Sequence, residues 1–141
     1  MALIRDPDRA AIGAKLAALK NNVRLAVFTQ ELECEYCTEN RLLAEEIAQL
    51  SDKLSVEVYN FVIDKQKADE YGIDKIPATA IIGKKDYGVR IFGIPAGYEF
   101  ASLLEALERV SSGESGLSVA TKSRLAKLAK PVHMQVFATP T

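Results

Sequence analysis

Two cysteines separated by two residues restrict the fold of this chain more than any other feature of its sequence. Cys34 and Cys37 are the only cysteines, and they lie between a segment with strand-like alternation, residues 23 to 29, and a segment with helical periodicity, about residues 34 to 50. Residues three positions apart lie on one face of a helix, so the two thiols can meet where the helix begins. This arrangement indicates a dithiol site at a strand-to-helix junction.

Hydrophobic periodicity outlines the other elements. Asp6 and Pro7 are suited to the N-cap and the first position of a helix that precedes the first strand. A second strand pattern begins at Leu54, and an unbroken apolar run extends it to Ile63, which is typical of a strand covered on both faces. There follow a short helix, strands over residues 78–82 and 89–92, and an amphipathic helix around residues 100–110. We predict an α/β fold with a central mixed four-stranded sheet, flanked by helices and with an extra N-terminal helix.

Composition limits the size and the partners of the protein. A chain of 141 residues that is 48% hydrophobic can bury one core and little more, so we expect one domain with an appendage. The net charge of −1, with both signs mixed, does not favour nucleic acid or a membrane surface as a partner. No apolar run approaches the roughly 18 residues that span a bilayer. We therefore expect a cytoplasmic protein, in which a single close pair of cysteines is typical of a catalytic or a metal site.

The end of the sequence repeats the pattern of its beginning. Residues 111–116, rich in Ser and Gly, predict a linker. Aligning Val132 with Val23 also places Leu125 on Leu16, and the same offset carries the counterpart of Cys34 just beyond the last residue. Any amphipathic helix followed by a strand would match this pattern loosely. We predict a domain over residues 1–112, and a linker with the helix and strand of a second, incomplete unit over residues 113–141.

The cysteine pair favours redox chemistry. A thiol reacts as its thiolate, and the unpaired N–H groups at a helix start stabilise that anion, so we predict Cys34 as the nucleophile and Cys37 as the resolving thiol. A structural zinc site normally needs four ligands, and only His133 offers a further soft one, which leaves zinc as a minor alternative. A simple structural staple is weakly motivated, because so short a loop removes little entropy from the unfolded chain. We expect neither a metal nor a cofactor.

Ile76-Pro77 provides the second signal. A proline lacks the N–H that a strand ladder uses, so its place directly before a strand needs a reason, which a cis bond facing the cysteines would supply. The alternative is a trans proline that merely ends a loop, although the preceding strand, helix and dithiol favour the cis bond. The backbone of Ile76 would then pair with an extended substrate. Tyr36, between the cysteines, is a candidate substrate contact, although it would equally pack on the helix. Lys75 is as well explained by solvation as by a role beside the thiolate.

These segments, in this order, resemble the thioredoxin fold over about residues 22 to 111. The stretches Cys34-Glu35-Tyr36-Cys37, Ile73-Asp74-Lys75-Ile76-Pro77-Ala78-Thr79 and Gly88 to Phe100 are similar to the N-terminal unit of the glutaredoxin-like protein disulfide oxidoreductases of thermophiles. That family has two thioredoxin-fold units in tandem, each with a Cys-x-x-Cys, and the segment from Val136 to Thr141 resembles what precedes the second motif. The chain would then stop before the second unit's cysteines.

The resemblance implies dithiol–disulfide exchange with protein disulfides, and a thioredoxin-reductase-like flavoprotein as the electron donor. The chain departs from thioredoxin at three positions near the site. Glu33 replaces the Trp before the first cysteine, Glu35-Tyr36 replaces Gly-Pro between the cysteines, and Phe28 replaces the buried acid of the preceding strand. Proton transfer at the site must therefore differ from that of thioredoxin.

Negative charge is concentrated around the cysteines. The four carboxylates there oppose the helix dipole, which should raise the pKa of the thiol and make the couple more reducing; they are Glu31, Glu33, Glu35 and Glu39. Two alternatives to the disulfide oxidoreductase remain. One is a glutathione-dependent glutaredoxin, for which the chain lacks a basic cluster, and the other is a docking or electron-relay module as in peroxiredoxin reductases. The apolar strand expected at residues 132–137 needs a partner, for which a homodimer is one possibility.

Overall fold

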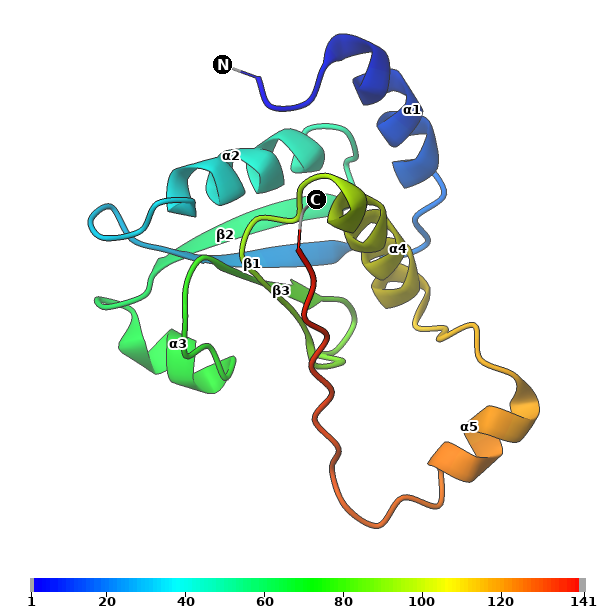
Figure 1. The fold of residues 1–141 in the computed structure, drawn as a ribbon. Helices are drawn as coiled ribbons and strands as arrows, with labels where there is room; N and C mark the ends of the chain where they lie inside the picture. The colour runs from blue at the N-terminus through cyan, green and yellow to red at the C-terminus, as the bar shows by residue number, and fades with distance from the viewer. Residues whose placement is uncertain (1, 140–141) are drawn as a thin grey trace.

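The computed structural model describes residues 2–139 and contains a four-stranded sheet with helices on both faces (Figure 1). In chain order the elements are α1 (Asp6–Leu16), β1 (Val23–Thr29), α2 (Cys37–Ala48), β2 (Leu54–Asn60), α3 (Lys65–Glu70), β3 (Ala78–Ile82), β4 (Val89–Phe92), α4 (Tyr98–Ser112) and α5 (Val119–Leu125). The strand order is β2-β1-β3-β4. Strands β1 and β2 are parallel, and the β1–β3 and β3–β4 pairs are antiparallel, which confirms the predicted mixed sheet.

The alternation of side chains along β1 separates two apolar layers. Val23, Leu25 and Val27 belong to the larger cluster, which α1, α2 and α4 complete. Ala26 and Phe28 point to the other face and pack with residues of α3 and β3. Successive side chains of a strand point to opposite faces, so a central strand buried on both faces must be apolar almost throughout. Strand β1 therefore lies at the centre of the fold, and its C-terminal end leads directly into the cysteine loop.

The second strand is shorter and more exposed than its apolar run predicted. Strand β2 ends at Asn60, whose side-chain oxygen accepts hydrogen bonds from the backbone N–H groups of Val62 and Ile63 at 3.0 Å each. Both of these side chains are exposed. The prediction of a strand covered on both faces to Ile63 was wrong, because β2 lies at an edge of the sheet and the Asn60 side chain turns the chain away from the ladder.

The last long helix extends further than the sequence indicated. Ser111, which the Ser/Gly content placed in a linker, lies inside α4 and is buried. Its hydroxyl accepts a hydrogen bond from the Asn21 backbone N–H at 2.9 Å and donates one to the Asn21 carbonyl at 2.7 Å. The helix ends instead at Ser112 and is capped by Gly113, whose φ of 72° is the left-handed conformation typical of a helix C-terminus.

The C-terminal appendage forms its helix but not its strand. Helix α5 begins after Ser118, whose hydroxyl accepts a hydrogen bond from the Thr121 backbone N–H at 3.1 Å. The strand expected at residues 132–137 is absent, and Val136 and Phe137 are both 89% exposed. A strand exists only where a second strand supplies its ladder, and no ladder pairs with this segment within residues 2–139. Pro140 and Thr141, which belong to the predicted resemblance, lie outside the described residues.

No helix within the described part of the chain has the length and apolar character needed to cross a membrane.

Candidate active site

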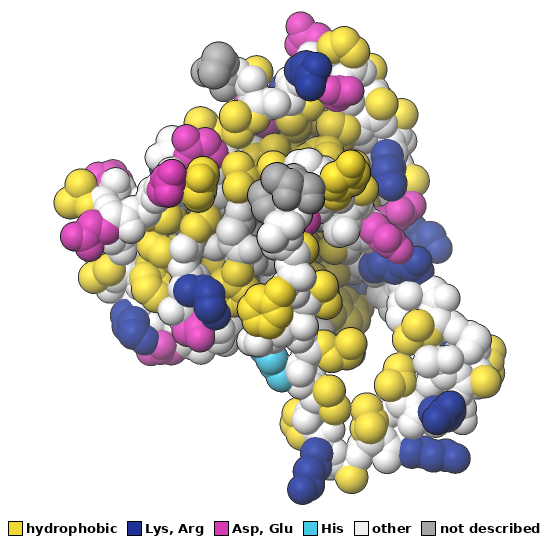
Figure 2. Space-filling view, viewed as in Figure 1, with side chains coloured by type: hydrophobic (Ala, Val, Ile, Leu, Met, Phe, Trp, Pro, Cys, Tyr) yellow, Lys and Arg dark blue, Asp and Glu magenta, His cyan; other side chains and the backbone are white. Residues whose placement is uncertain are grey.

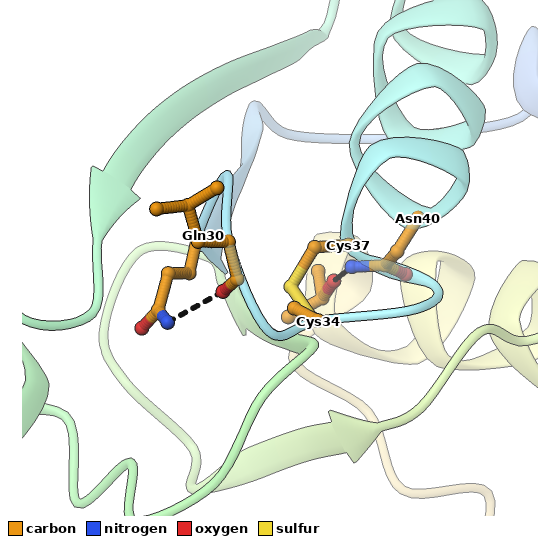
Figure 3. The surroundings of a disulfide bond; sticks show 6 residues. Gln30, Cys34, Cys37 and Asn40 are labelled. Atoms are coloured by element: carbon orange, nitrogen blue, oxygen red, sulfur yellow. Dashed lines mark hydrogen bonds between the residues drawn. A yellow bond between two sulfur atoms is a disulfide. The ribbon is translucent and has the colours of Figure 1, made fainter.

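Cys34 lies in the loop that joins β1 to α2, and Cys37 lies at the end of this loop, where α2 begins. The two cysteines form a disulfide (Figure 3). Their Cα atoms are 5.5 Å apart. The Gln30 side chain donates to the Leu32 carbonyl at 2.6 Å, and Glu33 has a φ of 58°, a left-handed conformation rare outside glycine. These two local features turn the chain back so that Cys34 faces the start of the helix.

Helix α2 begins at Cys37, three residues later than the prediction of a helix from Cys34. Cys34 therefore precedes the helix, and Cys37 occupies its first turn. The difference matters for access, because Cys34 is partly exposed, whereas Cys37 is buried with 0% of its surface exposed. Of the two cysteines, only Cys34 therefore has exposed surface.

A buried polar pair beneath the disulfide was not predicted from the sequence. Asn40, one helical turn after Cys37, donates from its side chain to the Thr79 hydroxyl at 3.2 Å, and both side chains are buried (Figure 3). Asn40 shares the apolar face of α2 with Leu43 and Ala44. An Asn at helical spacing from buried apolar residues was the available signal, although the sequence alone could not name its partner in β3.

The Ile76-Pro77 bond is cis, as its place before a strand predicted. Pro77 is buried and directly precedes β3, and its carbonyl accepts a hydrogen bond from Gly93 N–H at 2.8 Å. Thr79 follows two residues later and contacts Asn40 of α2. The fold thus brings Ile76-Pro77 and the cysteine pair, some forty residues apart in sequence, to the same end of the sheet.

The rim of the site is apolar and acidic. Tyr36 is 51% exposed and Leu32 is exposed as well. Glu31, Glu33 and Glu35 are also exposed, and Figure 2 shows acidic and apolar side chains side by side over this loop. Glu39, in contrast, has its Oε2 atom buried without a hydrogen-bond partner within the described chain.

The cation near the site is already paired. Lys75 donates to the carboxylate of Asp74 at 2.5 Å, and its ammonium lies 4.4 Å from the centre of the Phe92 ring. The hydrogen bond from Lys75 holds the pKa of Asp74 below its ordinary value. The structure therefore accounts for Lys75 through Asp74 and Phe92, without a contact to either sulfur.

Two further features lie away from the disulfide. Tyr59 on β2 donates to Glu57, which raises the pKa of Tyr59 to about 12, and Glu57 also pairs with Arg24. A hollow of about 460 Å³ lies between β4 and α4 and contains neither cysteine. Among residues 2–139, no three His, Cys, Asp or Glu side chains are grouped so as to hold a metal ion.

Comparison with known proteins agrees with this geometry. No family model matches the sequence. A probable thioredoxin of Methanothermobacter thermautotrophicus is 36% identical over 86 residues, which are 60% of this chain and 92% of that protein. A thioredoxin of Methanocaldococcus jannaschii is 31% identical over 90 residues, or 63% of this chain and 96% of that protein.

Solved structures extend the similarity beyond the length of those thioredoxins. The crystal structure of a protein disulfide oxidoreductase from Aeropyrum pernix superposes with a TM-score of 0.82 and 31% identity, and the match covers 89% of this chain. The chain spans only 55% of the length of that protein. The NTD N/C domain of the alkylhydroperoxide reductase AhpF of Enterococcus faecalis matches 89% of this chain with a TM-score of 0.76 and 25% identity, over 61% of its own length.

Three observations agree. The strand order is that of a mixed four-stranded sheet, the Cys-x-x-Cys lies at the start of α2, and the matches cover nearly the whole length of two thioredoxins. The chain belongs to the thioredoxin family of thiol–disulfide oxidoreductases.

Proposed function

We propose that this protein exchanges electrons with protein disulfides, that Cys34 attacks and that Cys37 resolves. The observation that carries this assignment is the difference in exposure between the two cysteines, because Cys34 is partly exposed and Cys37 is buried. A thiol that attacks an external protein must be reachable, whereas a resolving thiol needs to reach only its neighbour.

The reaction conserves electrons and protons at the two sulfurs. The Cys34 thiolate attacks a substrate disulfide, forms a mixed disulfide and releases the first substrate sulfur as a thiolate, which takes up a proton. Cys37 then loses its proton to water and attacks the Cys34 sulfur, so that the Cys34–Cys37 bond forms and the second substrate thiolate leaves. The substrate gains two electrons, and the protein disulfide described above is the product.

Ile76, Pro77 and Tyr36 are the proposed substrate contacts. Ile76 is partly exposed and precedes the buried Pro77, which leaves the Ile76 backbone available to an extended substrate chain. Tyr36 is exposed between the cysteines and offers a flat apolar contact. The carboxylates of Glu31, Glu33 and Glu35 oppose formation of the thiolate and favour a reducing couple.

The same comparisons support a proposal about the partners. We propose that a thioredoxin-reductase-like flavoprotein in the cytoplasm reduces the disulfide, in keeping with the similarity to part of a bacterial alkylhydroperoxide reductase. We also propose that residues 1–112 form the working domain and that residues 113–141 begin a second unit, since the similar oxidoreductase is nearly twice as long as the matched region. The exposed apolar segment 132–137 would then add to a sheet in a second copy of the chain.

Insulin reduction tests the assignment. The wild-type chain, supplied with dithiothreitol, is expected to precipitate reduced insulin faster than dithiothreitol alone. Cys34→Ser should abolish this activity. When Cys37→Ser is reduced, freed of dithiothreitol and mixed with oxidised insulin, it should accumulate a mixed disulfide with the substrate, visible as a mass increase that reductant reverses. Wild-type activity no greater than that of free dithiothreitol, from a folded protein, would instead favour the docking or relay module.

A further inference from the structure

The buried side of the disulfide carries a polar pair that the reaction as described does not use. Asn40 lies three residues after Cys37, so both side chains occupy one face of α2. Asn40 is 2% exposed and Thr79 of β3 is 4% exposed, and the 3.2 Å hydrogen bond between them belongs to the surroundings of the disulfide (Figure 3).

The surroundings of this pair are otherwise apolar. Both side chains line a small cavity of about 10 Å³, and its other lining residues are apolar, namely Leu25, Leu43, Ala44, Pro95 and Leu103. An amide buried among such neighbours is costly unless its donors and acceptor find partners. An Asn side chain has two N–H donors, and within the described chain one of them bonds to Thr79. No second hydrogen bond from this amide occurs within the described chain.

We propose that the Asn40 amide, oriented by Thr79, donates a hydrogen bond to the Cys37 sulfur while that sulfur is a thiolate. Asn40 is then a thiolate-stabilising residue, and Thr79 is a positioning residue. The inference rests on the proposed function, because it concerns the step in which Cys37 loses its proton to water and attacks the Cys34 sulfur of the mixed disulfide. The new bond joins the two protein sulfurs, and the substrate sulfur leaves with the electron pair.

The other charged groups around Cys37 leave this role open. Strand β3 and the loop of residues 93–97 contain no titratable side chain, and the single charged residue of β1, Arg24, pairs with Glu57. Lys75 and Asp74 pair with each other. On α2 itself Glu39 is the nearest charged residue in sequence, and although its Oε2 atom is buried, it lies two positions after Cys37 and therefore on a different side of the helix. In the preceding loop Cys34, Glu35 and Tyr36 are titratable, and the side chains of Glu35 and Tyr36 are exposed to solvent.

Because the Asn40 amide is neutral, its proposed role predicts how the rate of the resolution step depends on pH. Phe28, near the C-terminal end of β1, provides no carboxylate to accept the Cys37 proton. The rate of resolution should therefore follow a single ionisation, that of Cys37, and loss of the amide should move this ionisation to higher pH because the thiolate loses a donor.

Two-phase kinetics test the proposal in the full chain. The reduced protein is mixed with one equivalent of a disulfide that joins two thionitrobenzoate groups. Attack by Cys34 releases one coloured thionitrobenzoate, and resolution by Cys37 releases the second. Asn40→Leu is expected to slow the second release about tenfold and to shift its pH profile upward, with the first release changed less than about twofold. Thr79→Val should slow the second release to a smaller extent, and Thr79→Ser, which keeps the hydroxyl, should restore it.

The matched control is Leu43→Ala, which removes apolar volume from the same cavity and lowers stability without touching the amide. It should leave both releases at their wild-type rates. Equal rates of the second release in wild type, Asn40→Leu and Thr79→Val would overturn the inference, and so would equal slowing of both releases. If the wild type itself shows no second release, the proposed function fails instead, so the two failures are distinguishable. Thr79→Val, nearly the same size as Thr, keeps the test decisive if Asn40→Leu does not fold.

Discussion

At the scale of single residues, buried hydroxyl and amide groups fix positions that apolar packing leaves open. Ser111 of α4 joins the end of that helix to Asn21, the residue that leads into β1. The Asn21 side chain also donates to the Ser111 carbonyl at 2.8 Å. These three bonds connect segments ninety residues apart in sequence. A residue interpreted as linker on composition is thus part of the packed domain.

Ser111→Ala is expected to destabilise the fold. The substitution removes the partner of the Asn21 N–H and of its carbonyl, and an unpaired buried polar group costs about 1–3 kcal/mol. Urea unfolding followed by circular dichroism measures this loss. Ser112→Ala is the control, since the Ser112 hydroxyl bonds only to nearby backbone groups, at Arg109 and Glu114. Equal stability of the Ser111→Ala and Ser112→Ala variants would contradict the role given to the buried hydroxyl.

At the scale of elements, a single carboxylate attaches the N-terminal segment to α2. Glu46 accepts hydrogen bonds from the backbone N–H groups of Leu3 at 2.7 Å and Ile4 at 3.0 Å, and Arg9 of α1 lies 3.4 Å from the same carboxylate. Burial raises the pKa of Glu46, but the two N–H donors and Arg9 outweigh it and hold the pKa below its ordinary value of 4.5. Attachment of α1 therefore depends on the ionised form of Glu46.

The direction of this shift predicts an acid-sensitive attachment. A carboxylate whose pKa is lowered on folding contributes its full stabilisation above its ordinary pKa and loses it as the pH falls through the folded value. Glu46→Gln should thus cost about 1–2 kcal/mol at neutral pH, and the difference from wild type should shrink as the pH falls below about 4.5. Urea unfolding at several pH values tests this, with amide exchange at Leu3 and Ile4 as the local readout. A difference that does not change with pH would exclude the mechanism.

At the scale of the whole molecule, charge and exposure separate the appendage from the domain. Every Asp and Glu of the chain precedes residue 115, and the cations beyond it are Lys122, Arg124, Lys127 and Lys130. The side chains of residues 115–139 are exposed, and Lys122 makes a surface ion pair with Glu114. Exposed ion pairs contribute little to stability. We therefore expect the core to form without residues 115–139.

A chain that ends at Glu114 should fold independently. Its melting temperature should lie within about 3 °C of that of the full chain, because the lost contacts are solvent-exposed. Scanning calorimetry measures this, and insulin reduction should be retained. Sedimentation of both chains provides a second readout, since the proposed pairing of residues 132–137 predicts that only the full chain self-associates. A fall in melting temperature of more than about 10 °C would show that the appendage stabilises the domain.

The sequence by itself determined the local elements and the reactive pair. The period of two in Val23 to Thr29, the apolar face of residues 100–110 and the spacing of Cys34 and Cys37 depend on neighbours a few residues away. Local backbone geometry decides such patterns, so they can be read from the chain alone. The cis Ile76-Pro77 bond was also predictable, because a proline has no N–H for a strand ladder and its place directly before a strand favours a specific backbone role.

Only the tertiary structure decided which strand lies at the edge, which segment pairs and which polar groups meet. Strand β2 ends early and segment 132–137 remains unpaired because strands require partners distant in sequence. The contact between Asn40 and Thr79 likewise could not be predicted, because the two residues are thirty-nine positions apart in sequence. Residue type marked each as polar, but their contact beneath Cys37 arises from the packing of α2 on β3, which no local pattern encodes.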